Sequence, residues 1–323
     1  MCIGFVKTYA QFIIVRALLG IAEGGLYPGS LLFLSTIYTR EELALRVGVF
    51  YSSASLSGAF GGLLARGLSA IPTTSTVSGS WRWIFIVEGI ITCVIATGAY
   101  FFLPNSVETA SFLTAEERAF AQARLRASHL FTSEQERERF RWSEVRRGVL
   151  SLQLFFTGTV YFSICCALFS FSLFLPSIIQ SLGYTADKAQ LLSVPPYAVA
   201  SIVGVIVSFL SDRLRIRGIL ILLSLPLAII GYALIARVSS NVTKYGLTFL
   251  MAAGIYGSVP PLLVWILNNS AGHYKRATAG AMQVCMANCG GIVAAFLYSN
   301  TERPGYVKSH TIVLGVLCYS WIS

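Results

Sequence analysis

The sequence predicts an all-α membrane protein with several spanning helices. Hydrophobic residues make up 55% of its 323 residues and charged residues only 12%, whereas soluble domains carry about 25% charged residues. Its mean hydropathy is +0.70. The alternating pattern of a membrane barrel is absent, and helices or closed barrels are the structures that can span a bilayer. We therefore expect a polytopic helical bundle.

Seven uncharged apolar runs are each long enough to cross a hydrocarbon layer of ~30 Å, which needs about 20 residues. They are residues 47–65, 89–107, 148–186, 189–211, 218–236, 245–272 and 277–301. Residues 10–38 make an eighth span if Arg16 and Glu23 are tolerated inside it. Residues 1–6 are too short to span, and residues 310–323 end before a last helix is complete.

The segment from Pro104 to Arg147 is the one long polar stretch. It contains the capping-box pattern Thr114 to Glu117 and several Glu/Arg pairs spaced i,i+3 on a solvated helix. We expect a linker on the membrane face; the alternative is a regulatory or partner-binding helix. If this segment is cytoplasmic, most Lys and Arg lie on the cytoplasmic side, as the positive-inside rule expects. The net charge of +10 then has a topological cause, and no nucleic-acid partner is expected.

Residues that carry enzymatic or metal chemistry are sparse. The seven cysteines form no CxxC pair, and the three histidines, His129, His273 and His310, fall in expected loops. Nucleotide-binding loops, Gly-x-Ser-x-Gly elbows and HExxH motifs are also missing from the sequence. We therefore expect neither an enzyme nor a bound cofactor or metal.

Helix breakers and small residues recur within the apolar runs. Prolines occur at positions 28, 176, 195, 196, 226, 260 and 261, and such breaks are tolerated where neighbours or a cavity satisfy the freed carbonyls. Gly58 and Gly62 form a small-xxx-small face that allows close helix contact. Each feature alone fits ordinary membrane packing, whereas together they suggest a moving bundle around a cavity.

Arg16 and Glu23 are the two charges inside the first long apolar segment. Seven residues on an α-helix return to within about 20° of the same face, ~10.5 Å along the axis. A charge facing lipid at the bilayer centre costs at least ~2.5–3.5 kcal/mol, so both side chains should face the bundle interior. Arg16 could instead snorkel to the interface, and Glu23 could be a structural carboxyl. We favour a functional pair, because intramembrane charges usually mark ion or substrate pathways.

The segment that contains Arg16 and Glu23 resembles a known family. "RALLGIAEGGLYPG" (16–29) is similar to the fourth helix of the anion:cation symporter branch of the major facilitator superfamily. The likeness is strongest to its fungal allantoate permease group, which includes nicotinate, pantothenate and organic-anion permeases. Further matches follow in order: "WRWIFIVEG" (81–89), "FLTAEER" (112–118), "FLPSIIQSLGYTADKAQLLSVPPYA" (174–198), "SDRLRIRG" (211–218) and "PPLLVWILNNSAGHYKRATAGA" (260–281).

The resemblance implies two six-helix halves joined by a long loop. Residues 1–103 would be a partial N-terminal half, with the end of helix 3 and helices 4–6. Residues 104–150 would be the cytoplasmic loop, and residues 151–323 the C-terminal half with helices 7–11 and part of helix 12. Helices 1 and 2 would be missing, so we expect a chain truncated at its N-terminus. A monomer in the plasma membrane is the expected state.

The resemblance also implies residue roles. Arg16 would contact an anionic substrate and Glu23 would take part in proton coupling. The second half would contribute Trp265, Asn268, Asn269 and Asn288 to the substrate cavity. For Asn268 and Asn269, interhelical hydrogen bonding or a helix end is an equal alternative. Asn288 lies in "ANCGG", where the group often has Gly-Asn-x-Gly-Gly.

A gate is implied by "SDRLRIRG", which resembles the superfamily's loop between helices 8 and 9. Asp212 would pair with Arg213 or Arg217 and tie one end of the bundle together in one state. The alternative is that these arginines are only positive-inside anchors. Asn241 to Thr243 forms a glycosylation sequon on the expected outer side, in a short loop where occupancy is not favoured.

The expected function is secondary active transport, by proton-coupled symport of a small organic anion such as a carboxylate, vitamin or ureide. A carboxylate bound at Arg16 would offset its positive charge, so that Glu23 would hold a proton more readily. Substrate and proton would then bind cooperatively, and the coupling would be reciprocal. The alternative is a non-transporting relative, either a nutrient sensor or an inactive fragment.

Overall fold

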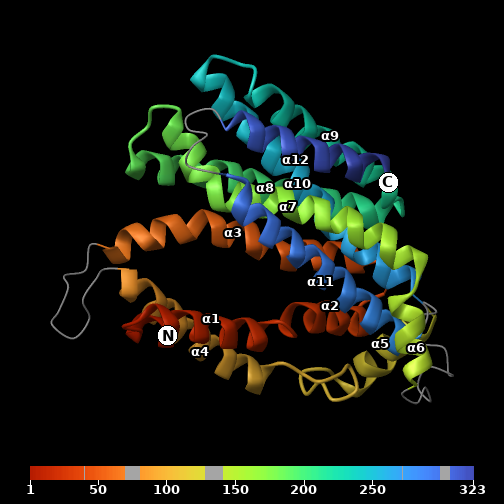
Figure 1. Ribbon diagram of the computed structural model, residues 1–323. Coiled ribbons are helices and arrows are strands. Elements are labelled where there is room, and N and C mark those ends of the chain that lie inside the picture. The colour runs from red at the N-terminus through yellow and green to blue at the C-terminus, as the bar shows by residue number, and fades with distance from the viewer. Residues whose placement is uncertain (40, 70–80, 128–140, 271, 299–305) are drawn as a thin grey trace.

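The computed structural model describes residues 1–39, 41–69, 81–127, 141–270, 272–298 and 306–323. These residues form a short 3₁₀ turn and α-helices, with no strand among them (Figure 1). The elements in order are η1 (Cys2–Phe5), α1 (Tyr9–Glu23), α2 (Leu26–Ile37), α3 (Leu43–Ser69), α4 (Trp81–Phe102), α5 (Ala115–Ala127), α6 (Trp142–Val149), α7 (Leu152–Ser181), α8 (Ala186–Leu214), α9 (Gly218–Ile235), α10 (Asn241–Asn269), α11 (His273–Leu297) and α12 (Val307–Ile322).

The described residues contain eight helical segments long and apolar enough to cross a membrane. They correspond one to one to the eight predicted spans, including Tyr9–Ile37, which holds Arg16 and Glu23. The shorter helix α12 is also apolar. The all-α polytopic fold class predicted from composition is therefore confirmed.

Several helix ends differ from the predicted spans. The span predicted at 89–107 is helix α4, which begins earlier, at Trp81, and ends at Phe102. The run predicted at 148–186 contains the end of α6 and all of α7, because the Ser151 side chain accepts a hydrogen bond from the Leu154 N–H and starts a new helix. The run predicted at 10–38 is interrupted at Gly24 and Gly25. Uncharged runs locate apolar helices, but caps and glycines set where each helix begins and ends.

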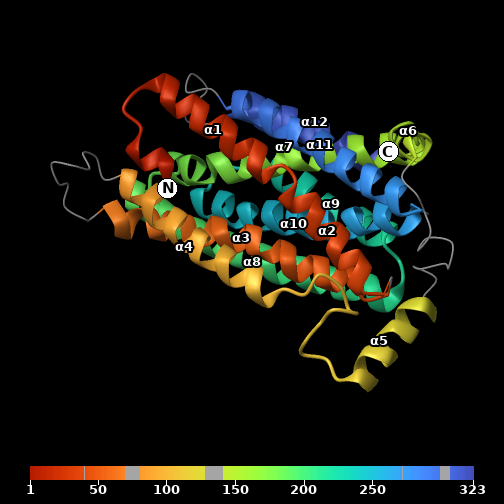
Figure 2. The same cartoon turned by 90° about the horizontal axis from the view of Figure 1, so that it is seen from below.

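The helices lie in two groups, one above the other in the view of Figure 1. The N-terminal group is α1–α4 and the C-terminal group is α7–α12, and they meet mainly along α3 and α8. Helices α5 and α6 lie at one end of the bundle, which we call the α5/α6 end (Figures 1 and 2). The core is centred on α10. In the most apolar 18-residue stretch of α10, 89% is buried, whereas the corresponding share in the α1–α2 segment is 6%.

Small and hydroxyl side chains line the seam between α3 and α8. The Ser55 and Ser201 hydroxyl oxygens are 2.6 Å apart, and the Ser201 hydroxyl donates to the Ser52 carbonyl at 3.3 Å. Gly58 packs directly on the Tyr197 ring. The small-residue face recognised in the sequence thus lies against the other helix group, where the absence of a side chain at Gly58 makes room for the Tyr197 ring.

Gly254 on α10 allows an equally close contact with α9. A Cβ at this position would overlap the backbone nitrogen and Cβ of Ala228 and lie 2.9 Å from the Ser224 carbonyl oxygen. Backbone atoms cannot turn aside, so Gly254→Ala should push the two helices apart. We expect it to lower the free energy of unfolding by about 1–3 kcal/mol, measured as a lower melting temperature in detergent.

The matched control for this substitution is on the same helix. Gly246 has no neighbouring atom within 4 Å of its ideal Cβ position. Gly246→Ala should therefore leave the melting temperature unchanged or raise it slightly, since alanine is the better helix former. Equal melting temperatures for the two variants would contradict the close contact of α9 with α10.

The capping box predicted at the start of α5 is present. The Glu117 carboxylate accepts hydrogen bonds from the Thr114 N–H at 2.9 Å and from its hydroxyl at 3.0 Å, while the Glu117 N–H donates to the Thr114 hydroxyl oxygen. These hydrogen bonds from Thr114 lower the pKa of Glu117. The linker thus contains a helix with a defined start. The Glu/Arg pairs predicted farther along involve residues 134–141 and lie almost wholly outside the described residues.

Candidate functional site

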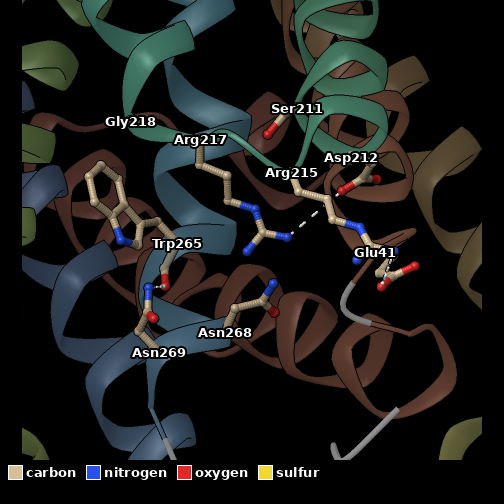
Figure 3. Close-up of a pocket in the computed structure, with 9 residues that line it drawn as sticks. All are labelled: Glu41, Ser211, Asp212, Arg215, Arg217, Gly218, Trp265, Asn268 and Asn269. Carbon is tan, nitrogen blue, oxygen red and sulfur yellow. Dashed lines mark hydrogen bonds and ion pairs between the residues drawn. The ribbon is translucent and has the colours of Figure 1, made fainter. Parts of the chain in front are cut away.

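A cavity of about 400 Å³ opens at the α5/α6 end, where the segment before α3 meets the ends of α8 and α10 and the start of α9 (Figure 3). Its lining carries acids, arginines, amides and one indole. The lining residues are Glu41, Ser211, Asp212, Arg215, Arg217, Gly218, Trp265, Asn268 and Asn269. We call this the end cavity. It brings together residues from both helix groups.

Asp212 joins the two helix groups at this cavity. Its carboxylate accepts hydrogen bonds from the backbone N–H groups of Ala44 at 3.1 Å and Leu45 at 2.7 Å. These N–H groups belong to the first turn of α3, where no intrahelical acceptor is available. The carboxylate also lies at the positive end of the α3 dipole. Asp212 on α8 therefore caps a helix of the other group.

Arg217 is the ion-pair partner of Asp212. Its guanidinium nitrogen lies 3.8 Å from the Asp212 carboxylate, and only 17% and 9% of the two side chains are exposed. In Figure 3 the Arg217 side chain extends across the cavity toward Asp212. Arg213 is exposed and does not line the cavity. Of the two arginines that the sequence offered as gate partners, Arg217 is the one in contact.

Two exposed ion pairs lie beside this junction, and sequence reasoning missed both. Glu41 and Arg215 are 2.7 Å apart, and Arg124 of α5 contacts both carboxylate oxygens of Glu42 at 3.3 and 3.0 Å. Exposed pairs of this kind contribute about 0–1 kcal/mol. In the sequence, the adjacent acids Glu41 and Glu42 before α3 were the feature that could have indicated these ion pairs. The largely buried Asp212 contact is the stronger link because its acceptor is charged and its donors are backbone groups.

Three of the predicted substrate residues also line the end cavity. The Trp265 ring packs on Gly218, and the Asn269 side-chain amide donates to the Trp265 carbonyl at 2.9 Å. Asn268 lies on the same last turns of α10, facing Arg217 in Figure 3. These three residues therefore share a cavity with the predicted gate. Asn288 on α11 is exposed and is not part of this lining.

Arg16 and Glu23 lie apart from the end cavity, on α1. The Arg16 guanidinium carbon is 5.4 Å from the centre of the Phe12 ring and 5.3 Å from that of Phe85 on α4. Glu23 is the last residue of α1, immediately before Gly24. Both side chains are exposed, and α1 has no buried residue. That they face a bundle interior stays a prediction.

Residues 1–295 match the model of the Major Facilitator Superfamily. The chain belongs to this superfamily. Its apolar helices and its fold make it an integral membrane protein with the architecture of a transporter.

Curated relatives within the superfamily are fungal transporters. An uncharacterized transporter of Schizosaccharomyces pombe is 36% identical over 312 residues, covering 97% of this chain and 62% of that protein. The high-affinity nicotinic acid transporter of Saccharomyces cerevisiae is 33% identical over 319 residues, covering 98% and 58%. The chain thus spans about 60% of the length of these relatives.

Solved transporters of the superfamily share the fold. The proton:xylose symporter XylE superposes with a TM-score of 0.69 at 14% sequence identity, over 97% of this chain and 70% of that one. The human organic anion transporter MFSD10 gives a TM-score of 0.62 at 17% identity, over 99% and 72%. These likenesses confirm the major facilitator fold that the sequence motifs implied.

Within this fold, the end cavity is lined by charged, amide and aromatic side chains that come from both helix groups. Among the described residues, no group of three His, Cys, Asp or Glu side chains could hold a metal ion. The contacts of Asp212 and of the Glu41–Arg215 pair join two helix groups at one end of the bundle. They break if that end opens. The arrangement therefore fits a conformational gate.

Proposed function

We propose that this chain belongs to a proton-coupled symporter of a small organic anion, in the anion:cation symporter branch near the allantoate permease group. The observation that carries the proposal is the Arg16/Glu23 pair, two turns apart on one apolar helix. The proposal places the protein in the plasma membrane as a monomer. The linker with α5 and α6 is placed on the cytoplasmic side, between a partial N-terminal half and a C-terminal half.

Arg16 suits carboxylate binding because of what surrounds it. Its guanidinium group lies near the Phe12 and Phe85 rings, which attract a cation through their π faces. Aromatic contact restricts the long side chain but consumes none of the five N–H donors at the edge of the guanidinium plane. Those donors can bind both oxygens of a carboxylate. Arg16 is thus a restrained cation with its hydrogen-bonding edge available.

Glu23 supplies the group that can carry the proton. It lies two turns from Arg16 and directly before Gly24 and Gly25, where the helix is interrupted. A carboxylate anion bound at Arg16 adds negative charge near Glu23, which favours the protonated form of this side chain. Binding of the anion and of the proton then support each other, and the coupling acts equally in both directions.

Alternating access needs a gate, and the end cavity supports one. In the proposal, the contacts of Asp212 with α3 hold the α5/α6 end closed, and their release lets the two helix groups rock apart. Trp265, Asn268 and Asn269 would meet the substrate on its way through this end. The name of the S. cerevisiae relative supports a carboxylate substrate, since nicotinic acid is a small carboxylic acid.

The proposal is tested by uptake of radiolabelled carboxylates into proteoliposomes. The panel should contain nicotinate, pantothenate, allantoate and an uncharged amide analogue of nicotinate. We expect accumulation of at least one anion when the outside is acidic, little accumulation without a pH gradient, and none of the amide. Binding of an anion without uptake would instead support a sensor. Absence of both would contradict the proposal.

A further inference from the structure

A second charged cavity lies at the junction of α6, α7 and α11. It measures about 410 Å³ and is lined by Arg146, Arg147, Leu150, Ser151 and Lys275. Helix α6 packs on the beginning of α11, and Gly148 makes this contact close, since its Cβ position faces Thr278 and the Lys275 carbonyl. Three cationic side chains from two separate elements therefore converge on one hollow, which we call the basic cavity.

The charges of the basic cavity are incompletely neutralised. Arg147 contacts Glu144 of the same helix at 3.0 Å, and 69% of the Arg147 side chain is exposed. Within the described residues, no carboxylate forms an ion pair with Arg146 or Lys275. The Ser151 hydroxyl donates to the Gly148 carbonyl at 3.0 Å and accepts from the Leu154 N–H. The site thus has about two surplus positive charges.

The depth of the basic cavity is set by the spans beside it. The apolar span of α7 begins at Leu152 and that of α11 at His273, so the cavity lies beside the first residues of two apolar helices. Its rim is apolar on the α7 side: Leu150 is 73% exposed and Leu152 is 76% exposed. Trp142 at the start of α6 is also 76% exposed, and tryptophan is enriched at membrane interfaces.

We propose that the basic cavity binds the headgroup of an anionic phospholipid. Arg146, Arg147 and Lys275 would contact the phosphate oxygens, while Leu150 and Leu152 would lie against the first part of the acyl chains. Basic cavities between spanning helices are suited to such headgroups. The exposed leucines favour a lipid over a free phosphate ion, because a lipid has acyl chains that can pack on them and a phosphate ion has no apolar part. The inference needs only that the chain spans a membrane, and is independent of the proposed substrate.

The test measures lipid binding to the purified protein in detergent. Native mass spectrometry should detect one tightly bound short-chain phosphatidylinositol 4-phosphate, with phosphatidylcholine binding at least tenfold more weakly. One surface Lys or Arg contributes about 1 kcal/mol to attraction by anionic lipid, which is roughly a fivefold change in affinity. Arg146→Gln and Lys275→Gln should each weaken binding about fivefold. Together they should weaken it about 25-fold.

The control variant is Arg141→Gln, which removes a charge next to the same helix but outside the cavity lining. It should leave the affinity unchanged, and melting temperatures should show that all variants are folded. Leu150→Asn removes the apolar contact without adding a charge to the cavity lining, and should weaken phosphoinositide binding without weakening inorganic phosphate binding. The proposal would be overturned if Arg141→Gln weakened lipid binding as much as Arg146→Gln or Lys275→Gln does. Inorganic phosphate that bound as tightly as the lipid would also overturn it.

Discussion

Replacing Glu23 with glutamine is expected to remove the proton-driven part of uptake. Glutamine resembles a protonated glutamate but cannot release a proton, so substrate movement no longer depends on the pH gradient. Coupling energies between two sites are typically 1–3 kcal/mol, or about 5- to 150-fold. We expect gradient-dependent accumulation in proteoliposomes to fall by about this range. Exchange of labelled for unlabelled substrate at equal pH should persist, because it needs no net proton transfer.

The matched control for Glu23 is Glu88 on α4. It is also an exposed carboxyl within an apolar helix, but it lies outside the proposed coupling pair. Glu88→Gln should retain the gradient dependence of uptake. Accumulation that still follows the pH gradient in Glu23→Gln would contradict the coupling role. Arg16→Ala should instead abolish both accumulation and exchange, since the anion would lose its cation.

Replacing Asp212 with alanine is expected to shift the protein toward a state open at the α5/α6 end. The substitution leaves the Ala44 and Leu45 N–H groups without their acceptor and removes the partner of Arg217. Hydrogen bonds to a charged group contribute about 1.5–3 kcal/mol, or roughly a 10- to 150-fold change in the ratio of closed to open forms. The transport rate should fall as the closed form is lost, because the transport cycle needs both the closed and the open form of this end.

The opening is measured by the distance between spin labels at positions 49 and 273, one in each helix group, in a background without native cysteines. The distance should lengthen in Asp212→Ala and change less in Asp212→Asn, which keeps one acceptor oxygen. Arg213→Ala is the control, because this neighbouring side chain is exposed and outside the end cavity. An unchanged distance in Asp212→Ala would show that this contact does not hold the end closed.

The fold was predictable because membrane insertion is governed by local composition. Each of the eight apolar runs needed no knowledge of its neighbours to be recognised, and charged residues outside the runs did not obscure them. The helix ends were less predictable. The α6–α7 boundary depends on the Ser151 cap, and the α1–α2 interruption on Gly24 and Gly25. Such features act through a few backbone hydrogen bonds and leave hydropathy almost unchanged.

The site was predictable only in part. The motif around Asp212 pointed to a gate acid, but its contact with α3 joins residues 168 and 167 positions apart. No local pattern encodes such a contact. Arg213 and Arg217 were equally good partners on the sequence, and the end of α8 at Leu214 decides between them by turning the chain before Arg217. The sharing of one cavity by Trp265 and Asp212 was likewise visible only in three dimensions.

The cap on α3 depends on the side chain of Asp212 but on no side chain of α3. Asp212 contacts peptide N–H groups that almost any residue at positions 44 and 45 would present, so α3 can change its side chains there without changing the bond. Paired substitutions between these positions and Asp212 should therefore be rare among related chains, even though the atoms touch. Proline is the exception, since it lacks the N–H group. A contact search based on correlated sequence change would pass over this junction, whereas a proline at position 45 would reveal it.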